Sequence, residues 1–438
     1  MRDMLGKKAD AFFEAFGKEE HYSGMRIQKS CPKLSKLCRD FESVPWCGNG
    51  FYADKSKISG NHPYHMGGLV YFQEPSAMSS VSALPIREGD FVLDLCAAPG
   101  GKTTQAAEKL SGSGLLVANE IVAKRAKLLS ENVERCGLSN TIVTNETPQK
   151  LSERFPEFFD RIIVDAPCSG EGMFRKEPQA VSEWSLAHTE ACANRQKLIL
   201  RDAVRMLRKD GYLVYSTCTF APCENEGVCD WLLTEFPELS LAPISLPGLS
   251  DGVGEWVHAR HDLSAAKRIF PHLAKGEGHF LALFHKKGEA APRPMEAQKT
   301  DCTDAVKLYR AFEKETFSKK REGTFSLFGE NLYLVPQGIS LDRLRVVRAG
   351  LHLGVCRKNR FEPSHALSLA TPADWFLRTV SLPCESVELQ KFLRGETISC
   401  DQKGWTAVLA DGFPVGWGKA SDGILKNHIP KGLRVISR

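Results

Sequence analysis

The chain has 438 residues, of which 42% are hydrophobic and 25% are charged, and its formal net charge is +5. This is the composition of an ordinary globular protein, long enough for two or three domains. No apolar stretch approaches the roughly 20 residues that span a membrane, and residues 1–8 contain no apolar run of the signal-peptide type. We therefore expect a soluble cytoplasmic protein with no membrane partner.

The central part of the sequence alternates strand-like and helical patterns. Residues 1 to about 87 are mixed and rich in short polar turns, whereas residues 88–287 alternate apolar runs with helical periods. We predict strands at 91–95, 115–119, 141–144, 161–164, 212–215 and 279–284, and helices at about 102–110, 122–136 and 194–208. This order predicts a doubly wound, mainly parallel α/β sheet.

A different pattern follows residue 287. Residues 288–299 read as a linker rich in proline and charge. Beyond it lie a basic region at 300–370 and short apolar runs separated by Gly and Pro turns, which predict a small β-rich module at 371–438. The strands of that module are expected at 405–409, 413–418 and 433–436.

The loop after the first predicted strand has features of a ligand-binding loop. Asp94–Thr104 ends like a phosphate-binding loop, but Cys96 stands where that loop needs glycine, and Ala98 breaks the dinucleotide fingerprint. Its glycines would still let the backbone approach a ligand closely. Glu120, at the end of the second strand, is where a carboxylate accepts hydrogen bonds from ribose. A ligand that has a ribose and needs no phosphate site fits S-adenosylmethionine better than ATP or NAD. The alternative is that Gly100 and Gly101 only form a tight turn.

Two cysteines each follow a predicted buried strand. Cys168 lies in an Asp-Ala-Pro-Cys turn, and Cys218 lies between two threonines. Because the carboxyl ends of parallel strands meet at one edge of a sheet, we expect the two thiols to share a pocket. The alternative for each is an inert buried thiol. The 14 cysteines contain no Cys-x-x-Cys pair, so we expect no metal site.

A pocket with two thiols and a methyl donor fits methylation of a pyrimidine at C5. This carbon is a poor nucleophile until a thiolate adds to C6 and turns the ring into an enamine, whose C5 can attack a sulfonium methyl group. Asp165 is placed to stabilise the ring at N3 as the ring becomes electron-rich. The two cysteines could divide addition and elimination between them.

Three motifs, Asp94–Thr104, Asp165–Arg175 and Ser216–Thr219, together resemble the Sun-type RNA cytosine-C5 methyltransferase family. Similarity to the bacterial ribosomal RNA small-subunit methyltransferase F subgroup extends to His62–His65, Gln73–Met78, Asp411–Lys419 and Leu425–His428. The resemblance implies a Rossmann-like class I S-adenosylmethionine-dependent methyltransferase domain at 88–287. It also implies an N-terminal α+β RNA-binding region at 1–87 and a C-terminal β-rich PUA-like RNA-binding module.

The resemblance also implies residue roles. Cys218 would be the nucleophile, and Cys168 would assist breakdown of the covalent RNA adduct. S-adenosylmethionine would be held by Cys96, Ala97, Ala98, Pro99, Gly100, Gly101, Lys102, Glu120, Asn145 and Asp165. The family often has an aspartate where Thr147 stands, so Asn145 or Glu146 is expected to replace it near the adenine.

The implied substrate is 16S ribosomal RNA or the small ribosomal subunit, methylated by a monomeric enzyme. A transfer-RNA cytosine-C5 methyltransferase and a non-catalytic ribosome-assembly factor are the alternatives. Basic clusters at 343–348 and 357–360, and the pair Arg175 and Lys176, are candidate phosphate contacts, or else solvated surface charges. His62 and His65 fit turn or packing residues better than metal ligands.

Overall fold

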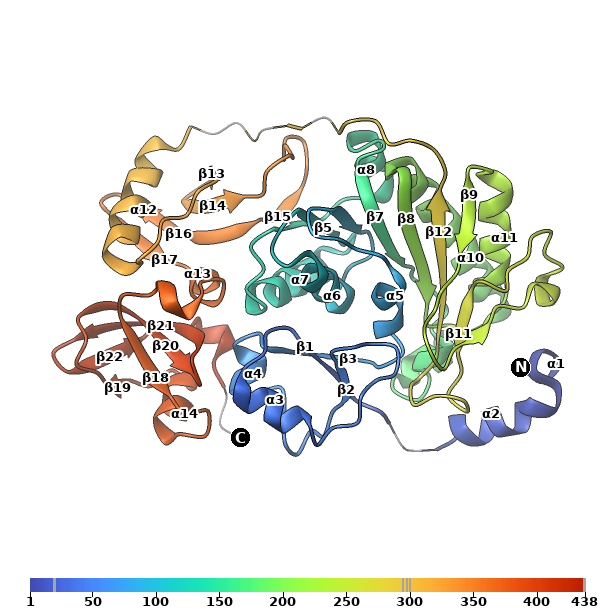
Figure 1. Cartoon of the computed structure of the whole chain (residues 1–438), viewed down its shortest axis with the longest axis horizontal. Coiled ribbons are helices and arrows are strands. Elements are labelled where there is room, and N and C mark those ends of the chain that lie inside the picture. Colours follow the sequence, from blue (N-terminus) through green and yellow to red (C-terminus); the bar gives the residue numbers. More distant parts are fainter. Residues whose placement is uncertain (19–20, 294, 297, 299–300, 436–438) are drawn as a thin grey trace.

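The computed structural model describes residues 1–18, 21–293, 295–296, 298 and 301–435, arranged in four sheets with helices around them (Figure 1). The largest sheet has ten strands in the order β10-β11-β12-β8-β7-β4-β5-β6-β15, with β9 paired to β12. These strands are β4 (Phe91–Asp94), β5 (Leu115–Asn119), β6 (Thr141–Thr144), β7 (Phe159–Asp165), β8 (Leu207–Thr217), β9 (Leu239–Ala242), β10 (Ser250–Asp251), β11 (Lys267–Ile269), β12 (His279–Lys286) and β15 (Val346–Ala349).

The central strands β6-β5-β4-β7-β8 are parallel, and β12 runs antiparallel to β8. The surrounding helices are α5 (Met78–Ala83), α6 (Gly101–Leu110), α7 (Ala123–Arg135), α8 (Pro148–Arg154), α9 (Pro178–Glu183), α10 (Leu186–Met206) and α11 (Glu226–Glu235). The predicted Rossmann-like α/β fold is therefore confirmed. The predicted helix at 194–208 begins earlier and ends at Met206, because the chain enters β8 directly at Leu207.

The apolar runs form strands because both faces of this sheet are covered. Every residue of β4, β5 and β6 is buried, which is the pattern expected of a parallel sheet between two helical layers. Residues of both layers pack with the strands into continuous hydrophobic clusters. The sheet thus gives a rigid base for the loops at its carboxyl edge.

An N-terminal unit packs beside this domain. It contains a three-stranded antiparallel sheet in the order β2-β1-β3 and four short helices. Its elements are α1 (Arg2–Leu5), α2 (Ala9–Phe16), β1 (Gly24–Ile27), α3 (Pro32–Cys38), β2 (Gly50–Tyr52), α4 (Pro63–Met66) and β3 (Val70–Gln73).

The C-terminal part carries two further sheets, with orders β13-β14-β16-β17 and β18-β20-β21-β22-β19. Its elements are α12 (Thr303–Thr316), β13 (Thr324–Phe328), β14 (Asn331–Val335), β16 (Leu351–Arg357), β17 (Arg360–Pro363), α13 (His365–Leu369), β18 (Thr379–Leu382), α14 (Val387–Leu393), β19 (Ile398–Ser399), β20 (Gly404–Ala410), β21 (Phe413–Ser421) and β22 (Ile424–Asn427). The strand predicted at 433–436 is wrong over its described residues, because Leu433 closes a 3₁₀ turn; residue 436 lies outside the described part.

One strand of the central sheet comes from the C-terminal region. β15 pairs antiparallel with the edge strand β6, with Val346 opposite Thr144 and Ala349 opposite Ile142. The segment that leads there crosses the predicted linker 288–299, in which residues 294, 297 and 299 lie outside the described part. Arg293, within that linker, donates to Asp160 at 2.5 Å. The C-terminal region is therefore joined to the core by main-chain and side-chain contacts.

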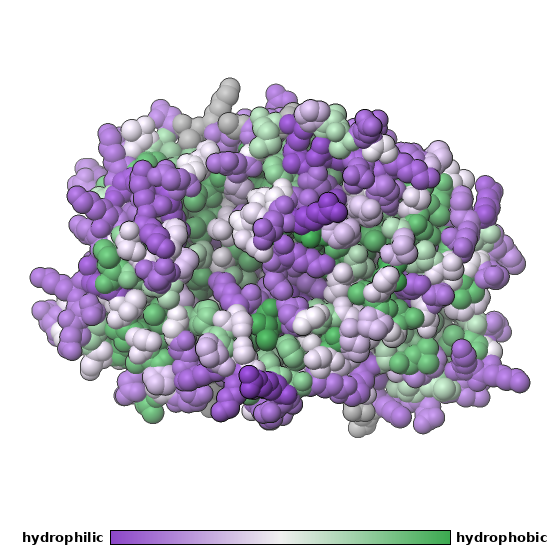
Figure 2. All heavy atoms as spheres, in the orientation of Figure 1, coloured by the Kyte–Doolittle hydropathy of each residue, from purple (hydrophilic) through white to green (hydrophobic). Residues whose placement is uncertain are grey.

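The surface in the view of Figure 2 is mostly hydrophilic, and hydrophobic residues appear on it in small, scattered groups. In the part of the chain that the structure describes, no helix combines the length and hydrophobicity required to cross a bilayer.

Candidate active site

The two cysteines singled out in the sequence lie next to each other. Cys168 follows β7 and Cys218 follows β8, and these strands are parallel neighbours. The Sγ atoms are 3.4 Å apart. The two thiols therefore meet at the carboxyl edge of the sheet, after adjacent strands.

The Cys168 turn is held by a buried carboxylate that the sequence did not single out. Glu224, with no exposed surface, accepts hydrogen bonds from Ser169 N at 3.0 Å and from Ser169 Oγ at 2.5 Å. Gln196 Nε2 donates to Glu224 at 2.8 Å and to Pro167 O at 3.0 Å. Burial raises the pKa of Glu224, and these donors oppose that shift. The network fixes the turn on both sides of Cys168.

The Cys218 segment has its own supports. Gly172 N donates to Cys218 O at 2.8 Å, and a Cβ on Gly172 would lie only 2.8 Å from that same oxygen. Glu171 accepts from Thr219 Oγ1 at 3.0 Å and from Phe220 N at 2.8 Å. The loop after β7 and the loop after β8 thus hold each other, which keeps the two sulfur atoms in contact.

The environment of Cys168 favours its protonated form. The hydrogen bond to Cys218, together with burial, raises the pKa of Cys168 well above its ordinary value. Cys168 is therefore a protonated thiol at neutral pH, and it can donate its S–H to the Cys218 sulfur. Burial also raises the pKa of Cys96, in the ligand loop, which makes that thiol a packing residue.

Asp165, at the end of β7, lies in a cationic and polar setting. Lys102 Nζ is 2.8 Å from one carboxylate oxygen, and Ser216 Oγ donates to the other at 2.8 Å. Burial by itself would raise the pKa of Asp165, but Lys102, His279 and these hydrogen bonds hold it below its usual range. Asp165 is therefore ionised at neutral pH, and it is an acceptor and not a proton donor.

His279 lies on the other side of the same carboxylate and was not predicted. Its Nε2 is 3.7 Å from Asp165 Oδ1 and 3.1 Å from Ser80 Oγ. Burial, with the nearby Lys102, lowers the pKa of His279 to about 3. It is a neutral imidazole at any physiological pH.

The predicted ligand loop joins β4 to α6. Gly100 has a φ of +116°, and an added Cβ there would lie 3.2 Å from Leu129. Asp94, at the end of β4, is fully buried; one carboxylate oxygen accepts from Thr103 at 2.6 Å, and the other has no partner among the described residues. Burial raises the pKa of Asp94 to about 7. A carboxylate oxygen without a partner beside this loop suits a ligand that brings hydrogen-bond donors, and it does not suit a phosphate.

Glu120 continues this cradle at the end of β5. It is 3% exposed; Oε1 accepts from Val122 N at 2.9 Å, and Oε2 lies 3.4 Å from Arg125 Nη1. The carboxylates of Asp94 and Glu120 therefore border the same loop from two adjacent strands. Ribose hydroxyls and an amino group are the donors that such a site accepts, so the residues fit S-adenosylmethionine.

The side chains of residues 145–147, after β6, make hydrogen bonds within the protein. Asn145 Nδ2 donates to Glu120 O at 2.7 Å and to Ile121 O at 2.9 Å, so this side chain fixes the backbone around Glu120. Glu146 is buried and accepts from Arg345 N at 2.8 Å. Thr147 caps helix α8.

Several candidate surface cations are engaged in ion pairs. Arg175 and Lys176 lie 2.7 and 3.2 Å from the buried carboxylate of Glu277. In the basic cluster 343–348, Arg345 pairs with Glu146 at 3.2 Å, and Arg348 pairs with Glu134. These charges thus serve the packing of loops and of β15. In the cluster 357–360, Arg357 pairs with Glu330 and Arg360 with Glu362.

The two histidines near the N-terminal sheet behave as turn residues. His62 Nδ1 accepts from Tyr64 N at 3.2 Å at the start of α4, and His65 Nδ1 is 2.7 Å from Gly60 O. Among the residues that the structure describes, no group of three or more His, Cys, Asp or Glu side chains could hold a metal ion.

Family models match four consecutive parts of the chain. Residues 1–75 match the N-terminal domain of 16S rRNA methyltransferase RsmF, and residues 81–285 match 16S rRNA methyltransferase RsmB/F. Residues 311–370 match the first C-terminal domain of RsmF rRNA methyltransferase, and residues 379–435 match the PUA domain of methyltransferase RsmF. The predicted PUA-like module is therefore confirmed.

Curated relatives extend the similarity over nearly the whole chain. The ribosomal RNA small subunit methyltransferase F of Vibrio parahaemolyticus is 35% identical over 418 residues, covering 89% of this chain and 85% of the relative. The protein of the same name from Aeromonas salmonicida is 33% identical over 421 residues, covering 92% and 87%. A solved methyltransferase homologue from Pyrococcus horikoshii is 28% identical with a TM-score of 0.55, covering 64% of this chain and 91% of that one. The chain therefore belongs to the ribosomal RNA small subunit methyltransferase F family.

Proposed function

We propose that this protein transfers a methyl group from S-adenosylmethionine to C5 of a cytidine in 16S ribosomal RNA, through a covalent bond between Cys218 and C6 of the base. The observation that carries the proposal is the 3.4 Å separation of the Cys168 and Cys218 sulfur atoms, at the same sheet edge as the Lys102–Asp165 ion pair. A protein that only binds RNA has no use for two apposed thiols. The names of the curated relatives support small-subunit ribosomal RNA as the substrate.

S-adenosylmethionine would be held by the loop 96–101 and by Glu120, and when bound it supplies an electrophilic methyl group. Gly100 and Gly101 let the loop backbone pack closely against Leu129 and Gln73, which fixes its path, and Glu120 would accept hydrogen bonds from the ribose hydroxyls. Asn145 would act indirectly, because its amide holds the backbone of Glu120 and Ile121.

Cys218 is the proposed nucleophile. A protonated Cys168 can stabilise the Cys218 thiolate by donating its S–H across 3.4 Å. When the Cys218 sulfur adds to C6, the π electrons of the C5–C6 double bond shift toward C4 and N3. N3 then takes up a proton. Asp165 is ionised, so it would accept hydrogen bonds from the 4-amino group and from protonated N3, while the Lys102 ammonium is the proton source within reach.

Release of the RNA reverses the addition. Methylated C5 still carries its original proton. That proton passes to a base, the proton on N3 returns to the Lys102 amine that supplied it, and the C5–C6 double bond re-forms as the Cys218 sulfur departs with its electron pair. Cys168 would assist by donating its S–H to the departing sulfur. We therefore expect Cys168→Ala to accumulate a covalent protein–RNA species, seen as a slower band on a denaturing gel. Normal turnover without such a band would reject this role.

A groove between the N-terminal sheet and the loop that follows the Cys168 turn supports approach of a single RNA strand. It has a volume of about 470 Å³, and its lining includes Tyr22, Lys55 and Phe72. Aromatic rings with interleaved cations are the surface that binds unpaired nucleotides, and the target cytidine has to leave its stack before it can meet Cys218.

The first test is transfer of radiolabelled methyl groups to small-subunit RNA by Cys218→Ala. We expect no transfer, whereas Cys223→Ala, which removes an exposed thiol five positions away, should act at the wild-type rate. Transfer by Cys218→Ala at the wild-type rate would reject the mechanism. Bisulfite mapping of total RNA with and without the protein then identifies the substrate, because protein-dependent sites confined to transfer RNA would replace the ribosomal assignment.

A further inference from the structure

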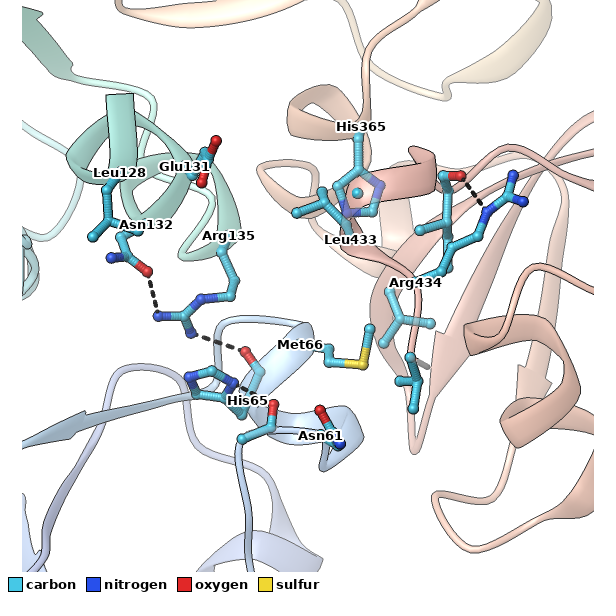
Figure 3. Close-up of a pocket in the computed structure, with 15 residues that line it drawn as sticks. Asn61, His65, Met66, Leu128, Glu131, Asn132, Arg135, His365, Leu433 and Arg434 are labelled. Carbon is cyan, nitrogen blue, oxygen red and sulfur yellow. Dashed lines mark hydrogen bonds between the residues drawn. The ribbon is translucent and has the colours of Figure 1, made fainter. Parts of the chain in front are cut away.

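A second cavity lies apart from the cysteines, where the three parts of the chain meet (Figure 3). Its volume is about 290 Å³. Met66 of α4 comes from the N-terminal unit, Leu128 and Arg135 of α7 come from the central domain, and His365 of α13 comes from the C-terminal part. The last described segment, 432–435, closes another wall.

The walls of this cavity are both apolar and polar. Leu128 is 47% exposed and Leu433 is 37% exposed, so two large aliphatic side chains are left in contact with solvent at the site. The His365 ring points into the cavity in Figure 3, although its Nδ1 is itself buried on the side of Gly416. Glu131 and Asn132 of α7 also line the cavity.

These groups fit a flat ring that carries both donors and acceptors. The aliphatic side chains offer contact to the faces of such a ring, and the His365 imidazole and the Glu131 carboxylate offer hydrogen bonds to its edge. The Glu131 carboxylate, which shares the lining with Arg135, disfavours a free phosphate. The size admits one base or nucleoside and excludes a helix. Unpaired bases in RNA are read in this way, by contact with their faces and hydrogen bonds at their edges.

The cavity is also connected to the cofactor loop. Asn132 Nδ2 donates to Pro99 O at 2.8 Å, and Asn132 Oδ1 accepts from Arg135 Nη2 at 3.0 Å. Arg135 Nη1 in turn donates to His65 O at 2.9 Å. One wall of the cavity is therefore hydrogen-bonded to the loop that we assign to the methyl donor.

We propose that this cavity binds one unpaired nucleobase of the ribosomal RNA, at a distance from the base that is methylated. The inference rests on the proposed function only in taking RNA as the partner. Its occupation would fix the relative positions of the N-terminal unit, the central domain and the PUA module on the RNA. It would also hold the cofactor loop through Asn132.

The test fills the cavity in the full-length protein. Gly432 lines the cavity, and a Cβ there meets nothing within 4 Å, so Gly432→Phe adds a ring to the lining without a backbone clash. The matched control is Gly48→Phe, because Gly48 is equally open and lies outside the cavity. Affinity for a 16S ribosomal RNA fragment is measured by fluorescence anisotropy in the absence of S-adenosylmethionine. We expect Gly432→Phe to weaken binding about tenfold, the loss of one stacked base, and Gly48→Phe to bind as the wild type does.

A second measurement locates the base. Ultraviolet cross-linking with mass spectrometry should place a nucleotide on peptides that carry Met66, His365 or Leu433, and Gly432→Phe should abolish those cross-links. Unchanged affinity of Gly432→Phe would overturn the proposal, and so would weaker binding without a cross-link at these peptides. Neither experiment involves methyl transfer, so a failure here is distinguishable from a failure of the proposed activity.

Discussion

Replacing Lys102 with methionine tests the electrostatic core of the site. The Lys102 side chain is 8% exposed, and its Nζ lies 2.8 Å from the Asp165 carboxylate, which is 33% exposed. Methionine keeps the length and the apolar contacts of the side chain but removes the cation. The variant therefore leaves an ionised carboxylate with Ser216 as its main remaining donor.

The size of the effect follows from this burial. Removal of one partner from a buried ion pair costs about 3–5 kcal/mol of stability. Because Asp165 is partly exposed and keeps the hydrogen bond from Ser216, we expect a value near the lower limit, about 3 kcal/mol. In the double variant Lys102→Met/Asp165→Asn no charge remains unpaired, so most of the lost stability should return although the enzyme stays inactive.

Urea unfolding followed by tryptophan fluorescence, at several pH values, measures these differences. In the wild type the pKa of Asp165 is lowered on folding. Its contribution is therefore present above the unfolded pKa of about 3.9 and is lost as the pH falls through the folded value. Without Lys102, burial raises the folded pKa of Asp165, so stability is lost as the pH rises through that value. The difference between wild type and Lys102→Met should thus be largest near neutral pH and should shrink below about pH 4. Equal destabilisation of the single and double variants at pH 7 would refute the reasoning.

Three more changes have defined outcomes. Gly100→Val should weaken S-adenosylmethionine binding at least tenfold by titration calorimetry, since φ is +116° there and a β-branched residue resists that region; unchanged affinity would contradict the assigned loop. Arg345→Ala should lower the free energy of unfolding by about 1 kcal/mol, because the buried Glu146 loses the nearer, half-exposed cation and keeps Lys150 at 3.9 Å, and recovery by Arg345→Lys separates charge from packing. Arg268→Met leaves Glu226, which has no exposed surface, without its guanidinium at 2.5 Å. It should cost about 3–5 kcal/mol, and Arg268→Met/Glu226→Gln should regain part of this in the same urea assay.

The site could be approached from the sequence because its chemistry follows strand ends. Predicted strands at 161–164 and 212–215 correspond to β7 and β8, and adjacent parallel strands necessarily bring the residues after them together. This is why Cys168 and Cys218 could be paired without coordinates. The periodicity of apolar residues predicted these strands correctly but located their ends less accurately. The strand predicted at 212–215, for example, begins at Leu207 as β8.

The supports of the site could not be predicted, because they depend on contacts between distant segments. Glu224 reads as an ordinary loop acid, and only the fold places it against Ser169, 55 positions earlier. Arg345 and Arg348 read as a basic patch for RNA, but acids of the central domain neutralise both. His279 reads as one residue of a buried strand. The sequence shows only that these charged or polar residues stand among apolar ones. That pattern indicates a buried contact but does not identify the residue that makes it.

The positions of these unpredicted contacts give them a common consequence. Arg26, on β1 of the N-terminal unit, has no exposed surface and donates to Gly101 O at 2.8 Å, at the start of the cofactor loop helix. On the opposite side, Arg345 precedes β15 and holds Glu146 next to the segment that borders Glu120. Both flanking regions, for which we propose RNA contacts, therefore end on backbone that frames the proposed methyl-donor site. We expect a shift of either region on binding RNA to move one side of that frame, and the affinities for RNA and for S-adenosylmethionine would then be linked. Linkage requires each ligand to change the affinity for the other by the same factor, which titration of each ligand in the absence and presence of the other measures.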